Sequence, residues 1–190
     1  MTTEEPLVPG VWLCRVCGEV VFSAGQPTRC PACGAFSRFL VEAGGDERIL
    51  GRDTPVPEAL AEGARRILDQ ENDTAELYSC VAAVSRHPRF KTTFRALQRI
   101  EARHAGLLAA AFRMKRGIST LRPALDGLTE KELLVAVRAR ESGTIGIYEA
   151  LLPDVAGTDF EVLFRALMEI EDDHNLMADR LEPLADTWET

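Results

Sequence analysis

Two stretches of the chain decide its fold: residues 90–105, FKTTFRALQRIEARHA, and residues 160–175, FEVLFRALMEIEDDHN. They lie 70 residues apart and are identical at eight of their sixteen positions. In both stretches the apolar residues recur at steps of three and four, which is the period of an amphipathic helix. The chain therefore carries a duplicated helical unit.

Turn and cap residues on either side of these stretches mark the ends of further helices. Pro57 suits a first helical turn, Thr129 and Thr158 each stand three residues before a glutamate, and Pro88 and Pro153 interrupt the helical pattern. We predict a mainly α-helical chain with four helices, over residues 58–86, 88–117, 129–152 and 158–186. Two helical hairpins joined by one longer connection are typical of a ferritin-like four-helix bundle.

The faces that should form the bundle interior carry four glutamates and two histidines: Glu71, Glu101, His104, Glu141, Glu171 and His174. Burying one ionised carboxylate without a partner costs several kcal/mol, and no lysine or arginine lies on these faces. Two divalent cations would balance the four carboxylates. The pattern therefore predicts a dinuclear metal site in the bundle.

The ligand types restrict the choice of metal. One Glu from each of two helices, with Glu-x-x-His from each of the other two, is the ligand set of di-iron and di-manganese proteins with this bundle. Oxygen and imidazole ligands favour iron or manganese over copper. Tyr78 and Tyr148 lie one heptad after the glutamates of the first and third helices, either to hydrogen-bond the ligands in catalysis or to pack in the core. Gly143 and Gly146 are expected to open space beside the metals for a small oxidant, or to permit a bulge in the helix.

A second metal site is indicated near the start of the chain by two Cys-x2-Cys pairs, twelve residues apart: Cys14, Cys17, Cys30 and Cys33. Four thiolates at this spacing form a tetrahedral site for iron or zinc. Iron would make the module a one-electron carrier, whereas zinc would make it structural. We therefore divide the chain into a rubredoxin-like four-cysteine module of short strands and turns, a linker and the bundle, at residues 1–42, 43–57 and 58–190.

The composition excludes several functions. Of the 190 residues 46% are hydrophobic, enough for a core, and the formal net charge is −8. A main role in binding nucleic acid would need a clustered basic surface, which the sequence lacks. No apolar stretch of signal or membrane-span length follows the acidic start. We expect a cytoplasmic protein without a membrane partner, whose thiols are reduced or bound to metal.

With both sites in view, nearly the whole chain resembles the rubrerythrins. The segment from Cys14 to Ala35 is similar to the short rubredoxin module of that family, with Trp12 and Phe39 where such modules place aromatics near the metal. The six bundle ligands are similar to those of the family's di-iron domain. The resemblance implies iron at both sites, reduction of hydrogen peroxide to water, a reductase that delivers electrons from reduced pyridine nucleotide, and a homodimer.

Two features depart from the usual family pattern. The four-cysteine module comes first, an order that resembles the reverse rubrerythrins. One turn before Glu141 the family commonly has a further ligand glutamate, where this chain has Arg138. We expect a peroxidase that uses the six bundle ligands and the two tyrosines. The alternatives are a ferroxidase or oxygen-reducing di-iron oxidase, and a non-catalytic iron-binding protein with zinc at the cysteines.

Overall fold

The computed structural model describes residues 9–45 and 48–188. The parts of the predicted module, linker and bundle at residues 1–8, 46–47 and 189–190 lie outside the described residues. Within residues 9–45 and 48–188 the chain is mainly helical, as predicted, with four long helices: α1 (Ala61–Val84), α2 (Pro88–Ala111), α3 (Glu130–Leu151) and α4 (Asp159–Trp188). Short 3-10 turns precede α1 (η2, Glu58–Leu60) and link α3 to α4 (η3, Leu152–Val155).

Helix α2 is shorter than predicted, because it ends at Ala111 rather than at residue 117. Arg113 has a φ of +54°, in the left-handed region. The N–H of Met114 bonds to the carbonyl of Ala109 at 2.9 Å, which is the bond pattern of a Schellman termination. Glycine usually occupies the left-handed position of this motif, so an arginine there left no recognisable stop signal in the sequence.

The two predicted capping boxes have different outcomes. At the start of α3, the Thr129 hydroxyl accepts from the N–H of Glu132, whose carboxylate accepts from the N–H of Thr129. At the start of α4, the Thr158 hydroxyl instead donates to the carbonyl of Val155 at 2.7 Å. Both helices nevertheless begin within two residues of the predicted positions.

A small antiparallel sheet carries the cysteines. The central strand β1 (Gly10–Cys14) pairs with β2 (Val20–Ser23) on one side and with β3 (Leu40–Glu42) on the other. A 3-10 turn, η1 (Ser37–Phe39), leads into β3. Because β1 ends at Cys14, opposite the buried Leu40, the first cysteine pair begins inside the module.

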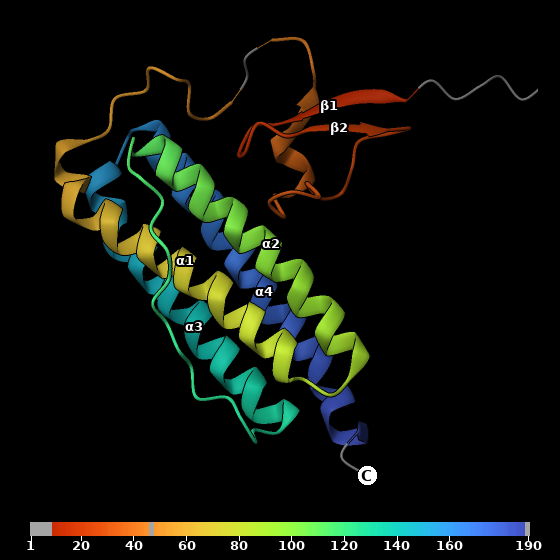
Figure 1. Ribbon diagram of the computed structural model, residues 1–190. Coiled ribbons are helices and arrows are strands. Elements are labelled where there is room, and N and C mark those ends of the chain that lie inside the picture. The colour runs from red at the N-terminus through yellow and green to blue at the C-terminus, as the bar shows by residue number, and fades with distance from the viewer. Residues whose placement is uncertain (1–8, 46–47, 189–190) are drawn as a thin grey trace, which may run out of the picture.

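The bundle is covered differently on its two sides. Helix α1 packs on α2 and α3 packs on α4, which gives the two predicted hairpins. Figure 1 shows the sheet beside α2 and α4, whereas the crossover between the hairpins, residues 112–129, runs across α1 and α3. Among the described residues, no helix combines the length and the apolar character needed to cross a membrane.

The module is held on the bundle by its second cysteine pair. Arg29 forms an ion pair with Asp173 of α4 at 2.7 Å. Gly34 has a φ of +78°, and a Cβ there would lie 3.1 Å from Ile170 of α4 and 3.8 Å from Ile100 of α2. Only glycine combines this backbone conformation with so close an approach. The turn at Cys33–Gly34 therefore lies in the groove between α2 and α4.

Candidate metal centres

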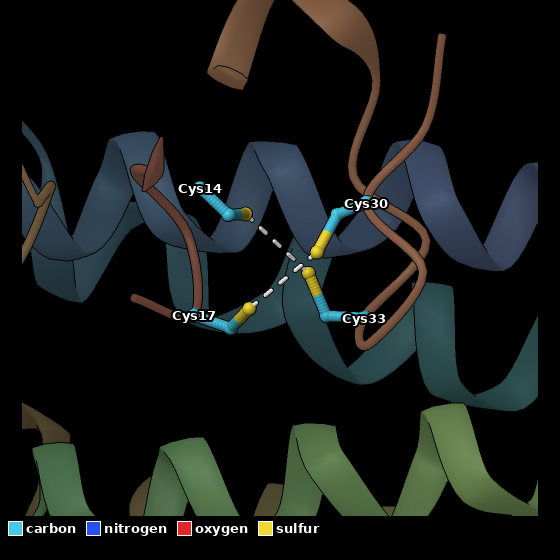
Figure 2. A group of neighbouring side chains, drawn as sticks. All are labelled: Cys14, Cys17, Cys30 and Cys33. Carbon is cyan, nitrogen blue, oxygen red and sulfur yellow. Dashed lines mark hydrogen bonds between the residues drawn. The ribbon is translucent and has the colours of Figure 1, made fainter. Parts of the chain in front are cut away.

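The side chains of four residues point toward one another between two turns of the module: Cys14, Cys17, Cys30 and Cys33 (Figure 2). Each Cys-x2-Cys turn ends in a glycine with positive φ, Gly18 at +75° and Gly34 at +78°. The N–H of each glycine bonds back to the carbonyl of the first cysteine in its pair, at 2.8 and 2.9 Å. Two turns with the same geometry thus bring the four thiols together.

The sulfur separations fit one tetrahedral metal ion. The Sγ atoms of Cys14 and Cys33 lie 3.7 Å apart, as do those of Cys17 and Cys30. Metal–sulfur bonds of about 2.3 Å in a tetrahedron place sulfur atoms about 3.8 Å apart. Three of the four side chains are buried, so four thiolates here need a cation to balance their charge. The donor set suits iron and zinc alike.

The six predicted bundle ligands come together as two overlapping groups: Glu71, Glu101, His104 and Glu171 in one, and Glu101, Glu141, Glu171 and His174 in the other. All six are buried, and within each group the ligand atoms lie within 4.8 Å of one another. Because Glu101 and Glu171 belong to both groups, these two would bridge a pair of metal ions. Each ion would then have one further Glu and one His of its own.

All four carboxylates of this centre keep at least one oxygen without a hydrogen bond. Both oxygens of Glu101, and one oxygen each of Glu71, Glu141 and Glu171, are buried without a hydrogen-bond partner among the described residues. Burial and the nearby charge of Glu171 raise the pKa of Glu71 to about 8. The same two causes raise the pKa of Glu141 well above its usual value. Such a cluster is costly unless cations or protons neutralise it.

Both histidines turn Nδ1 into the centre. Nδ1 of His104 lies 3.2 Å from the Glu171 carboxylate, and Nδ1 of His174 lies 2.8 Å from that of Glu101. Burial alone would lower the pKa of each imidazole, but the surrounding carboxylates, Glu101 foremost, raise it well above its usual value. When no metal is bound, protons therefore neutralise the carboxylates in place of metal cations. The donor atoms present fit two metal ions.

Tyr78 and Tyr148 each hydrogen-bond a ligand carboxylate of the opposite hairpin. The hydroxyl of Tyr78 donates to Glu141, and that of Tyr148 donates to Glu71. Both rings are fully buried in the core, so each tyrosine packs the bundle and also orients a ligand. Burial and the charge of Glu71 raise the pKa of Tyr148 well above its usual value, which keeps its hydroxyl a donor.

One hydrogen bond joins the two centres. Nε2 of His104 lies 2.9 Å from the carbonyl oxygen of Cys33. Because a carbonyl only accepts, Nε2 carries the proton and Nδ1 is left to bind a metal. Arg103, one residue earlier, donates to the carbonyl of Cys17 at 3.2 Å. A cysteine of one centre is thus in direct contact with a histidine of the other.

The expectation for the α3 glycines is wrong. Gly143 and Gly146 are exposed on the outer face of α3. A Cβ on Gly146 would meet nothing within 4 Å, and one on Gly143 would lie 3.7 Å from the side chain of Gln70. The helical period explains this, since residue 143 lies about 200° around the helix from Glu141.

Three polar residues near the ligands, Arg138, Gln70 and Arg140, form contacts outside the metal centre. The Arg138 guanidinium points to α4, where it pairs with Asp179 at 2.8 Å and with Glu182 at 2.7 Å, so it supplies no group to the metal centre. Gln70 and Arg140, which no motif singled out, directly precede two ligands and hydrogen-bond each other at 2.8 Å. The 70-residue offset pairs these two residues, but they are not identical, so the repeat gave no signal for them.

Comparison with known proteins found no significant match to this chain among family models, curated proteins or solved structures. The fold and the donor groups by themselves define a class: a helical bundle with a buried carboxylate and histidine cluster, joined to a four-cysteine module. Both clusters are suited to binding metal ions.

Proposed function

We propose that this protein is a rubrerythrin-like non-haem di-iron oxidoreductase that reduces hydrogen peroxide to water, with electrons relayed through iron at the four cysteines. The observation that carries the proposal is the contact of His104 with Cys33, because it connects the ligands of the two centres. Carboxylate and imidazole ligands favour iron or manganese in the bundle, and four thiolates suit iron in the module. The resemblance to rubrerythrins adds support for iron at both.

Reduction of one hydrogen peroxide molecule takes two electrons and two protons and gives two water molecules. When bound, two ferrous ions in the bundle would supply the two electrons, and an iron at the cysteines would restore them one at a time. The chain holds the reacting geometry: Glu101 and Glu171 are placed to bridge, while tyrosine hydroxyls fix Glu71 and Glu141. The buried walls exclude bulk water from the reaction.

The electron route in this proposal lies within one chain. It runs from Sγ of Cys33 through the main chain to the carbonyl oxygen, crosses 2.9 Å to Nε2 of His104, and continues through the ring to Nδ1. The ion pair of Arg29 with Asp173 keeps the module in place. An external reductase, a homodimer and a cytoplasmic location belong to the same proposal, on the basis of the rubrerythrin resemblance.

One observation favours a second candidate, a ferroxidase or oxygen-reducing di-iron oxidase. Arg138 occupies the position of the additional ligand glutamate of rubrerythrins and is directed away from the centre, toward Asp179. The remaining ligands form a symmetric set of four Glu and two His. A ferroxidase takes its electrons from its ferrous substrate and gives no role to the contact between the two centres, and the rubrerythrin resemblance favours peroxide over oxygen as the oxidant.

The test has two stages. Metal analysis and the visible spectrum of the aerobically purified protein should give three iron atoms per chain and a red, ferric-thiolate absorption. The reduced protein should then be oxidised by hydrogen peroxide much faster than by oxygen. A colourless protein with zinc at the cysteines would overturn the relay, and faster oxidation by oxygen would favour the oxidase.

A further inference from the structure

The module closes one side of the bundle centre. Gly34 lies against Ile100 and Ile170, which directly precede the two bridging glutamates, and Cys33 accepts the hydrogen bond from His104. All of these bundle residues belong to α2 and α4. The side of α1 and α3 lies away from the module and is crossed by residues 112–129.

On that side, a polar pair joins α1 to α3 next to two of the ligands in the sequence. Arg140 donates to the amide oxygen of Gln70 at 2.8 Å. Gln70 in turn donates to the hydroxyl of Thr144 at 3.0 Å. Gln70 and Arg140 directly precede the ligands Glu71 and Glu141, and Thr144 is fully buried. Hydrogen bonds thus run from the half-buried Gln70 and Arg140 to the buried Thr144, one helical turn after Glu141.

A pocket of about 450 Å³ lies outside this pair. Gln70 and Arg140 line it, together with small residues of α3 that include Gly143. The crossover supplies apolar walls at Leu121 and Leu125. Among the described residues that line it, Arg140 carries the only charge, so the pocket suits a small neutral or anionic molecule better than a metal cation.

We infer that this pocket is the entrance by which a small oxidant reaches the metal centre, and that the Gln70–Arg140 pair is its gate. Rotation of Gln70 breaks three hydrogen bonds, to the side chain and the carbonyl of Arg140 and to the Thr144 hydroxyl, and opens the way to the carboxylates. Partners in the gate can bond a passing peroxide, whereas bulkier molecules are held back. The inference rests on the proposed function for the identity of the oxidant.

Two glycines of α3 provide a matched test. Gly143 lines the pocket and Gly146 does not, although both are exposed. The iron-loaded, oxidised protein is mixed with azide, and the absorbance change on binding is followed by stopped flow. Gly143→Phe, whose ring would lie across the pocket, should slow azide association at least about tenfold, and Gly146→Phe should stay within about twofold of the wild type. Equal rates in the two variants would overturn the inference.

Gln70→Ala tests the gate in the opposite direction, and it serves if Gly143→Phe fails to fold. Losing these three hydrogen bonds should speed oxidation of the reduced protein by tert-butyl hydroperoxide about fivefold more than oxidation by hydrogen peroxide. An unchanged ratio would overturn the gate. If neither peroxide oxidises the wild type but azide entry depends on Gly143, the peroxidase proposal fails and the entrance stands. If peroxide reacts rapidly but Gly143→Phe leaves azide entry unchanged, the peroxidase proposal stands and the entrance fails.

Discussion

The two candidate metal centres are built in opposite ways. The four cysteines lie within 20 consecutive residues, on two turns with the same backbone geometry. The six bundle ligands come from four helices, and neither group of four is complete without the packing of both hairpins. The first centre is therefore a local structure whose metal holds it together, whereas the second is a product of the complete fold.

The two centres therefore derive their stability from different sources. The module has only a short three-stranded sheet and few buried apolar side chains, so metal binding contributes much of its folding free energy. The bundle has two large clusters of buried apolar side chains, one containing Phe164 and the other its repeat counterpart Phe94. It can fold without metal, but it then keeps its carboxylates at a cost.

The largest expected effect is on the module. Cys30→Ser should release the metal ion, whose binding is worth about 10 kcal/mol or more in structural sites, and the module should become sensitive to protease. The bundle should stay folded, with a thermal midpoint within about 5 °C of the wild type. Limited proteolysis and circular dichroism check both. Cys80→Ser, outside either centre, is the control, and loss of the bundle together with the module would contradict the separation.

A smaller effect concerns pH in the metal-free bundle. The unfolded chain releases the Glu71 and Glu141 protons near pH 4.5, whereas the folded chain keeps them to higher pH because both pKa values are raised. The raised pKa values of His104 and His174 act in the same direction. Stability should therefore fall as pH rises from about 5 to about 9, and metal-loaded protein should show the opposite trend, because protons compete with metal.

Glu141→Gln sharpens this prediction, because glutamine resembles the protonated acid. The metal-free variant should lose less stability between the two pH values than the wild type, and it should bind one metal ion in the bundle instead of two. Thermal melts across the pH range and metal analysis measure both effects. Glu149→Gln, exposed on the same helix, should behave as the wild type. A pH dependence identical in the two variants would contradict the assignment.

Much of the fold and of the candidate bundle site could be predicted from the sequence, because the 70-residue repeat marks both the helices and their ligands. The equal spacing of Glu101-x-x-His104 and Glu171-x-x-His174 specified helix faces, and charge balance specified metals. The early end of α2 could not be predicted, because it depends on an arginine in a conformation that glycine usually adopts. The contact of His104 with Cys33 could not be predicted either, because it depends on how the four-cysteine module docks on the bundle.

In the proposed relay, the two centres exchange electrons when peroxide reacts. The most direct measurement mixes the fully reduced, iron-loaded protein with hydrogen peroxide without oxygen and follows the ferric-thiolate absorption of the four-cysteine iron. In the wild type this absorption should return within one turnover, and in Glu141→Gln at least about 100-fold more slowly. Equally fast return in both proteins, or no return in the wild type, would contradict the relay.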